Sequence, residues 1–197
     1  MGSKNTEQGT QNKEQGTRNK EQGIKKEEFL ALSPQPLSFP PNGSAVGGRP
    51  DWDTYFMDIA HVVAKRANCR RRQVAAVIVH DRRIISTGYN GTPRGVKNCF
   101  EGGCARCAGN APSGASLEEC LCVHAEQNAI CQAAYHGIRT AGAAIYVTFS
   151  PCLTCCKLII NAGIREVVYD GEYAFADQAR ALLDEAGVVC RRVNDDQ

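Results

Sequence analysis

The chain has 197 residues, 43% of them hydrophobic, and a formal net charge of +2 at pH 7. This length and apolar content suit one domain with a buried core plus a tail. The nearly neutral charge argues against a long nucleic acid or an anionic membrane as the main partner. The sequence also has no apolar run long enough to span a bilayer and no apolar signal segment. We therefore expect a cytoplasmic protein that acts on a small molecule.

The first 48 residues differ in composition from the rest. Residues 5–25 repeat a seven-residue unit as NTEQGTQ, NKEQGTR and NKEQGIK. No pair of positions in the unit is apolar and each copy holds a glycine, which disfavours a coiled coil. A stretch rich in Pro, Gly and Ser follows up to Gly48. We predict a disordered tail and linker over residues 1–48 and a folded domain over residues 49–197.

Hydrophobic periodicity predicts a first helix from Asp51, with Trp52, Phe56, Ile59 and Val63 on one face. Two strands rich in β-branched residues then form a hairpin, and a loop rich in cysteine and glycine follows over residues 91–121. Helices alternate with strands in the remainder, which predicts a three-layer α/β/α domain around a mixed sheet of about five strands. The expected strands are 73–80, 83–90, 143–149, 166–170 and 188–193, and the later helices are 124–137, 152–163 and 176–187.

Two short motifs stand at predicted helix starts and carry metal-binding residue types. His124 and Glu126 open one helix, and Cys152 and Cys155 open the next, behind Pro151. Cysteines three residues apart on a first helical turn face the same way, and the helix N-terminus favours thiolates. Two thiolates and one imidazole leave the fourth position of a zinc ion open for water, as in catalytic sites. Glu126 is then placed to handle protons beside that water. The plain alternative is that the cysteines are core residues and Glu126 is an exposed first-turn residue.

Together the motifs H-x-E and P-C-x-x-C resemble those of zinc-dependent nucleobase deaminases. Longer segments, among them RRQVAAVIV, RIISTGYNGTPRG, VHAEQNAI and YVTFSPCLTCCKLIINAGI, look like deoxycytidylate (dCMP) deaminases. The resemblance covers nearly all of the chain after Gly48 and implies a cytidine-deaminase-like fold. It also implies Zn²⁺ on His124, Cys152 and Cys155, with Glu126 as the proton shuttle. Activated water would replace the amino group at C4, so that dCMP becomes dUMP and supplies thymidylate synthesis.

The same resemblance implies nucleotide-binding residues, each with a plainer alternative. Asn90 of GYNG would reach the sugar, although Asn-Gly is also a favoured turn. Tyr173 of GEY would lie near the phosphate. The run Arg70–Arg72, with Arg71 as our choice, has guanidinium groups suited to phosphate but could be a solvated face.

Eleven cysteines in a chain without an export signal favour metal ligands or core thiols over disulfides. Some dCMP deaminases hold a second, structural zinc, and the resemblance places its ligands at Cys69, Cys99 and Cys122. The fourth ligand could be Cys104, Cys107 or Cys120, and we choose Cys104. A metal that ties this loop to the first helix would offset the entropy of ordering it. The alternative is that these thiols are simply buried or free.

Two other functions remain open from the sequence. One is another deaminase of the same fold, acting on a tRNA adenosine, a free base or a riboflavin precursor; the other is a non-catalytic, zinc-stabilised binding module. The resemblance further implies a homo-oligomer, with a hexamer favoured, and dCTP and dTTP as allosteric effectors.

Overall fold

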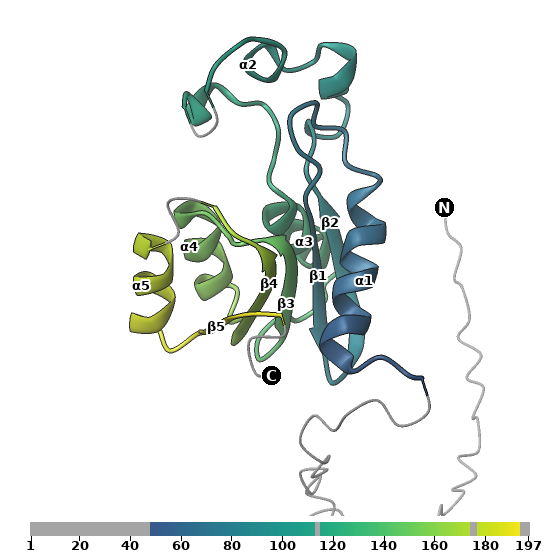
Figure 1. Ribbon diagram of the computed structural model, residues 1–197, viewed down its shortest axis with the longest axis vertical. Helices are drawn as coiled ribbons and strands as arrows, with labels where there is room; N and C mark the ends of the chain where they lie inside the picture. Colours follow the sequence, from purple (N-terminus) through teal and green to yellow (C-terminus); the bar gives the residue numbers. More distant parts are fainter. Residues whose placement is uncertain (1–47, 113–114, 174–176, 194–197) are drawn as a thin grey trace, which may run out of the picture. The chain divides into compact units, whose positions relative to one another are not determined.

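The computed structural model describes residues 48–112, 115–173 and 177–193, shown in colour in Figure 1. The predicted disordered tail lies outside these residues, apart from Gly48. In the described part of the chain, no helix is long and apolar enough to cross a membrane.

The described strands form one sheet in the order β2-β1-β3-β4-β5. β1 pairs antiparallel with both β2 and β3, whereas β3, β4 and β5 run parallel. The sheet is therefore mixed, as predicted. The strand bounds are β1 Ala75–His80, β2 Arg83–Tyr89, β3 Ala144–Phe149, β4 Glu166–Gly171 and β5 Val189–Arg192.

Helices cover both faces of the sheet, with α1 on one side and α3, α4 and α5 on the other (Figure 1). Two apolar clusters fill the layers between them. Successive residues of β3 point to opposite faces of the sheet and so belong to different clusters. Ile145 and Val147 belong to the larger cluster, and Tyr146 belongs to the cluster under α1. The predicted three-layer α/β/α arrangement is confirmed. The helices are α1 Trp52–Ala64, α2 Ala105–Ala108, α3 Ala125–Tyr135, α4 Leu153–Asn161 and α5 Asp177–Glu185.

The apolar stripe of α1 is rotated from the predicted one. Phe56 and Met57 are buried, together with Ala60, whereas Trp52 is 37% exposed and stacks on Phe56. The helix begins where expected, because the Asp51 carboxylate accepts a hydrogen bond of 2.8 Å from the Thr54 backbone N–H.

The loop predicted over residues 91–121 lies beyond one end of the sheet (Figure 1), and its described residues form three short helical turns. They are the 3₁₀ turns η1 Cys99–Glu101 and η2 Leu117–Glu119, with α2 between them. The neck of this loop is closed by a β-bridge in which Gly91 and Val123 exchange backbone hydrogen bonds of 2.8 and 3.2 Å. The residue after this bridge is His124, so the loop ends directly at the start of α3.

Candidate metal centre

His124 and Glu126 occupy the start of α3. His124 is the N-cap residue, and its backbone N–H donates to the Gln127 side-chain oxygen at 2.9 Å. A second hydrogen bond of 2.8 Å, from the Asn128 side chain to the Tyr89 carbonyl, ties the first turn to the end of β2. These contacts fix the position of the imidazole and of the carboxyl group two residues later.

Cys152 and Cys155 occupy the start of α4, which follows the carboxyl end of β3. Cys152 is the N-cap residue, and Cys155 lies in the first turn and is fully buried. As predicted from their spacing, both sulfurs face the same way: each lies 3.4 Å from His124 Nδ1. The two helices therefore bring the three predicted ligands together.

The geometry of this His/Cys/Cys group fits a zinc ion. Its three ligand atoms all lie within 4.8 Å of one another. A tetrahedral Zn²⁺ with Zn–S of about 2.3 Å and Zn–N of about 2.0 Å would hold sulfur and nitrogen about 3.5 Å apart. The observed 3.4 Å matches this separation. Because three protein ligands leave one tetrahedral position open, the group has the composition of a catalytic rather than a structural zinc site.

The electrostatics of the group also favour a cation. A hydrogen bond from the Cys155 thiol lowers the pKa of Cys152 to about 4. The same contact raises the pKa of Cys155. The hydrogen bond with Cys152 raises the pKa of His124. A divalent ion would supply the charge that allows the second thiol to ionise and the imidazole to bind as the neutral form.

Glu126 lies beside this group and is only 4% exposed. Burial raises the pKa of its carboxyl group above the usual value. A carboxyl with a raised pKa holds a proton at higher pH than an exposed glutamate does, which suits a group that accepts and returns protons. The plain alternative, an exposed first-turn glutamate, is therefore contradicted by its burial.

The three predicted nucleotide-binding residues have different surroundings. The Asn90 side chain accepts from the Val74 backbone N–H and donates to the Arg72 carbonyl, both at 2.9 Å. Arg71 points to the cysteine loop, where its guanidinium donates to the carbonyls of Gly109 and Ala111. These hydrogen bonds tie the Arg71 side chain to the loop.

Arg72, the next residue of the arginine run, contacts two aromatic rings, one of which is Tyr173. Its guanidinium lies 4.7 Å from the centre of the Phe149 ring and 4.9 Å from that of Tyr173. The Tyr173 backbone N–H donates a hydrogen bond of 3.0 Å to the hydroxyl group of Ser150, a residue that lies two positions before Cys152 in the chain. Arg72, Phe149 and Tyr173 thus stand at the end of β3 next to the metal group. The sequence offered the arginine run but no signal for which arginine faces the site.

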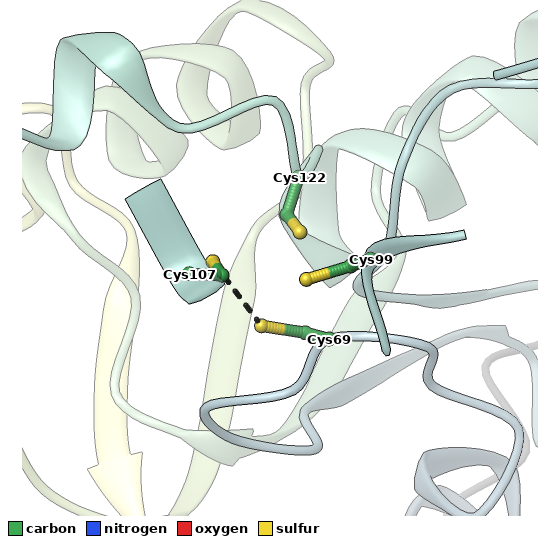
Figure 2. A group of neighbouring side chains, drawn as sticks. All are labelled: Cys69, Cys99, Cys107 and Cys122. Atoms are coloured by element: carbon green, nitrogen blue, oxygen red, sulfur yellow. Dashed lines mark hydrogen bonds between the residues drawn. The ribbon is translucent and has the colours of Figure 1, made fainter. Parts of the chain in front are cut away.

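Six cysteines gather in and beside the loop, and Figure 2 shows four of them, Cys69, Cys99, Cys107 and Cys122, turned toward one another. These four sulfurs lie within 4.8 Å of one another, and Cys69 and Cys107 are 3.9 Å apart. Three of the four predicted structural ligands are thus brought together. The fourth differs, because Cys107 rather than the chosen Cys104 completes this group. Cys104 caps the short helix α2, and Cys107 lies on that helix with its sulfur toward Cys69.

The fold and the His/Cys/Cys group with its buried carboxyl define a metal-binding α/β/α protein. The family model described as "Cytidine and deoxycytidylate deaminase zinc-binding region" matches residues 50–170. The chain therefore belongs to the cytidine and deoxycytidylate deaminase family.

Individual relatives support this placement. The chain is 47% identical over 144 residues to the deoxycytidylate deaminase of Schizosaccharomyces pombe, an alignment that covers 73% of this chain and 44% of that protein. It is 43% identical over 129 residues to the deoxycytidylate deaminase of Mycobacterium phage D29, covering 63% of this chain and 98% of the phage protein. The chain thus spans less than half the length of the fission-yeast relative.

A solved structure supports the fold. The dCMP deaminase of cyanophage S-TIM5, crystallised in complex with dCMP and dUMP, matches with a TM-score of 0.60 and 31% identity. The match covers 71% of this chain and 95% of that one.

Proposed function

We propose that this protein catalyses the zinc-dependent hydrolytic deamination of dCMP to dUMP and ammonia. The observation that carries the proposal is the buried Glu126 carboxyl beside the ligand group of His124, Cys152 and Cys155. The relatives named deoxycytidylate deaminase, and the cyanophage enzyme crystallised with dCMP and dUMP, support the choice of substrate.

The chain's own residues divide the chemistry between metal binding and proton transfer. A zinc ion held by His124, Cys152 and Cys155 would lower the pKa of water toward neutrality and so provide the nucleophile. Glu126 takes a proton from that water and delivers it to N3 of the pyrimidine. It then takes the proton of the new C4 hydroxyl group and passes it to the departing amino group, which leaves as ammonia. Burial raises the pKa of this carboxyl group above the usual value, which suits a group that both accepts and donates a proton.

Nucleotide recognition is assigned to the residues around the end of β3 and to the loop after β2. The Tyr173 and Phe149 rings contact the Arg72 guanidinium, and we assign this cation of the Arg70–Arg72 run to the nucleotide phosphate. Asn90 retains one N–H and one lone pair after its two backbone hydrogen bonds, and these are available for a deoxyribose hydroxyl.

The test is an ammonia-release assay with zinc-loaded protein and a panel of dCMP, CMP, deoxycytidine, guanine and adenosine-containing RNA. Replacing Glu126 by Gln removes the proton carrier without touching a metal ligand. We expect Glu126→Gln to lower kcat with dCMP by at least about 10²-fold while zinc content is unchanged. Glu185→Gln, which changes an exposed carboxyl on α5, is the matched control and should retain full activity.

Three outcomes would contradict the proposal. Wild-type protein with full zinc content and no turnover of any substrate would favour the binding-module alternative. Preference for a base, a riboflavin precursor or an RNA adenosine over dCMP would move the protein to another branch of the same fold. Full activity in Glu126→Gln would remove the assigned role of the carboxyl.

We also infer that the cysteine loop binds structural zinc, since its thiols form groups of metal-ligand spacing. The cytoplasmic location, the supply of dUMP for thymidylate synthesis, the hexamer and the dCTP and dTTP effectors stay predictions of the family resemblance.

A further inference from the structure

The cysteine loop is organised around sulfur. Among the described residues, the apolar cluster at this place consists of buried Cys99, Cys104, Cys107 and Cys122, with Cys69 and Cys120 partly buried against it. The larger apolar side chains nearby point outward, since Phe100 is 58% and Leu121 is 52% exposed. A segment whose interior consists of thiols gains little from hydrophobic burial, so another interaction has to order it.

The six sulfurs form two groups of four rather than one. Cys69, Cys99, Cys107 and Cys122 make the first group, which we call the outer group because it includes Cys69, which precedes the loop. Cys104, Cys107, Cys120 and Cys122 make the second, the inner group. In each group the sulfurs all lie within 4.8 Å of one another. Cys107 and Cys122 belong to both.

The separations fit metal–thiolate tetrahedra and not disulfides. Adjacent sulfurs lie 3.6 Å apart at Cys107–Cys120, 3.9 Å at Cys69–Cys107 and 4.0 Å at Cys104–Cys120. Two sulfurs on one tetrahedral zinc, each about 2.3 Å from the metal, are about 3.8 Å apart. A disulfide would need about 2.05 Å, and the described cysteines are all free.

The six sulfurs are the number of ligands that two tetrahedral metal ions need when they share two of them, so no sulfur remains without a metal. Two tetrahedra that share one edge need six ligands, of which two bridge both metals. A single zinc on the outer group would leave Cys104 and Cys120 as an unused pair of thiols 4.0 Å apart. A single zinc on the inner group would leave Cys69 and Cys99 unused in the same way.

Backbone donors are distributed as such a cluster requires. The Arg70 N–H donates to Cys99 Sγ and the Leu121 N–H donates to Cys104 Sγ, both at 3.4 Å. Each of these sulfurs belongs to one group only, so it keeps lone pairs for N–H donors after binding one metal. The two donors serve opposite ends of the sulfur cluster and offset part of its negative charge.

We propose that Cys69, Cys99, Cys104, Cys107, Cys120 and Cys122 hold two zinc ions in one binuclear cluster, with the thiolates of Cys107 and Cys122 as bridges. Six thiols release six protons to solvent as two Zn²⁺ bind, no redox step is involved, and the cluster carries a net charge of −2. The inner metal closes the loop on itself, and the outer metal joins it to the segment after α1. This inference deepens the proposed structural role of zinc in the loop and is independent of the deaminase reaction.

Native mass spectrometry of the reduced, zinc-loaded full chain tests the stoichiometry. We expect about three zinc ions per chain, one on the His/Cys/Cys group and two in the cluster. Cys104→Ser/Cys120→Ser removes two ligands of the inner metal alone and should lower the count to about two. The control is Cys131→Ser/Cys190→Ser, whose cysteines lie outside both groups, and it should keep about three.

Two results would overturn the binuclear cluster. One is a count of about two zinc ions that is the same in wild type and in Cys104→Ser/Cys120→Ser, which means one mononuclear site in the loop. The other is disulfide-linked or iron-containing protein. His124→Ala separates the two proposals, because it removes the catalytic zinc and activity but leaves the cluster ions in place.

X-ray absorption at the zinc edge of the wild type gives a second readout that does not depend on a folded variant. Edge-sharing tetrahedra with Zn–S of about 2.3 Å place the two metals about 3 Å apart. A zinc–zinc scattering path near that distance is expected, together with a first shell dominated by sulfur. Its absence from a sample with about three zinc ions per chain would contradict the bridging thiolates.

Discussion

Gly88 lies on β2 where that strand passes directly under the start of α3, and its replacement by alanine tests how tightly the catalytic helix is placed. A Cβ atom at this position would lie 2.2 Å from the Ala125 carbonyl oxygen and 2.3 Å from the Ala129 backbone nitrogen. Both atoms are helix backbone, so no side-chain rotation relieves the overlap. Strand and helix would have to separate by about 1 Å to restore ordinary contact distances.

The expected cost of Gly88→Ala follows from this geometry. Overpacking of a well-filled interior typically costs 1–3 kcal/mol, and an overlap with backbone belongs at the upper end, so we expect a loss of about 3 kcal/mol in the free energy of unfolding. The separation would also move His124 and Glu126 relative to the cysteines on α4. A displacement of about 1 Å in such a site lowers activity by about 10²-fold.

Urea denaturation of zinc-loaded protein measures the first effect, and dCMP turnover with zinc content measures the second. The matched control is Gly109→Ala, whose added Cβ would meet the Ala105 carbonyl oxygen at 3.4 Å, an ordinary contact. We expect this control to stay within about 0.5 kcal/mol of wild type. If Gly88→Ala were as stable as Gly109→Ala, the close approach of β2 and α3 would not constrain the site and the reasoning would be wrong.

Two further predictions concern charged groups outside the metal centre. Asp51→Ala should destabilise the protein by about 1 kcal/mol, because it removes the N-cap of α1, whereas Asp51→Asn should cost less. The hydrogen bond from the Thr54 N–H lowers the pKa of Asp51, so the contribution of the carboxylate is present above its usual pKa and is lost as pH falls through the lowered one. Urea titrations between neutral and acid pH should therefore bring wild type and Asp51→Asn together; an unchanged difference would contradict the cap. Arg191→Met should cost about 2 kcal/mol in the same assay, because Arg191 bridges Asp53 at 2.6 Å and Glu166 at 2.8 Å and is 24% exposed. Partial recovery in Arg191→Lys is expected, and a neutral Arg191→Met would show that the bridge contributes nothing.

The hydrophobic pattern of the sequence predicted the helices and strands well, because it depends on residues that are close together in the chain. The inner strands β1, β3 and β4 are mostly buried apolar runs, since helices cover both faces of the sheet, and the helices carry apolar residues at helical spacing. The proximity of the three proposed zinc ligands could be expected for the same reason. His124, Cys152 and Cys155 each stand at a helix start, so their positions follow once the helices are placed.

The remaining site residues depend on contacts that the sequence does not encode locally. Whether Arg71 or Arg72 faces the aromatic pair is decided by the path of the chain just before β1, where neighbouring side chains point to different sides. The fourth ligand of the outer group is set by how α2 folds back onto the segment after α1. The spacing of the cysteines in the sequence left Cys104, Cys107 and Cys120 as candidates for the fourth member of this group. The orientation of α2 brings Cys107 to the other three sulfurs.

The bridge between Gly91 and Val123 holds the two ends of the cysteine loop side by side, directly before the start of α3. The ends of the intervening segment are pinned side by side, so residues between them can be added or removed without changing the distance that the chain has to span. The length of this segment can therefore change while its two ends stay in place. The residue that follows the bridge is His124. Insertions or deletions at the exposed tip of the loop would then leave the start of α3, and with it the imidazole and carboxyl groups, where they are.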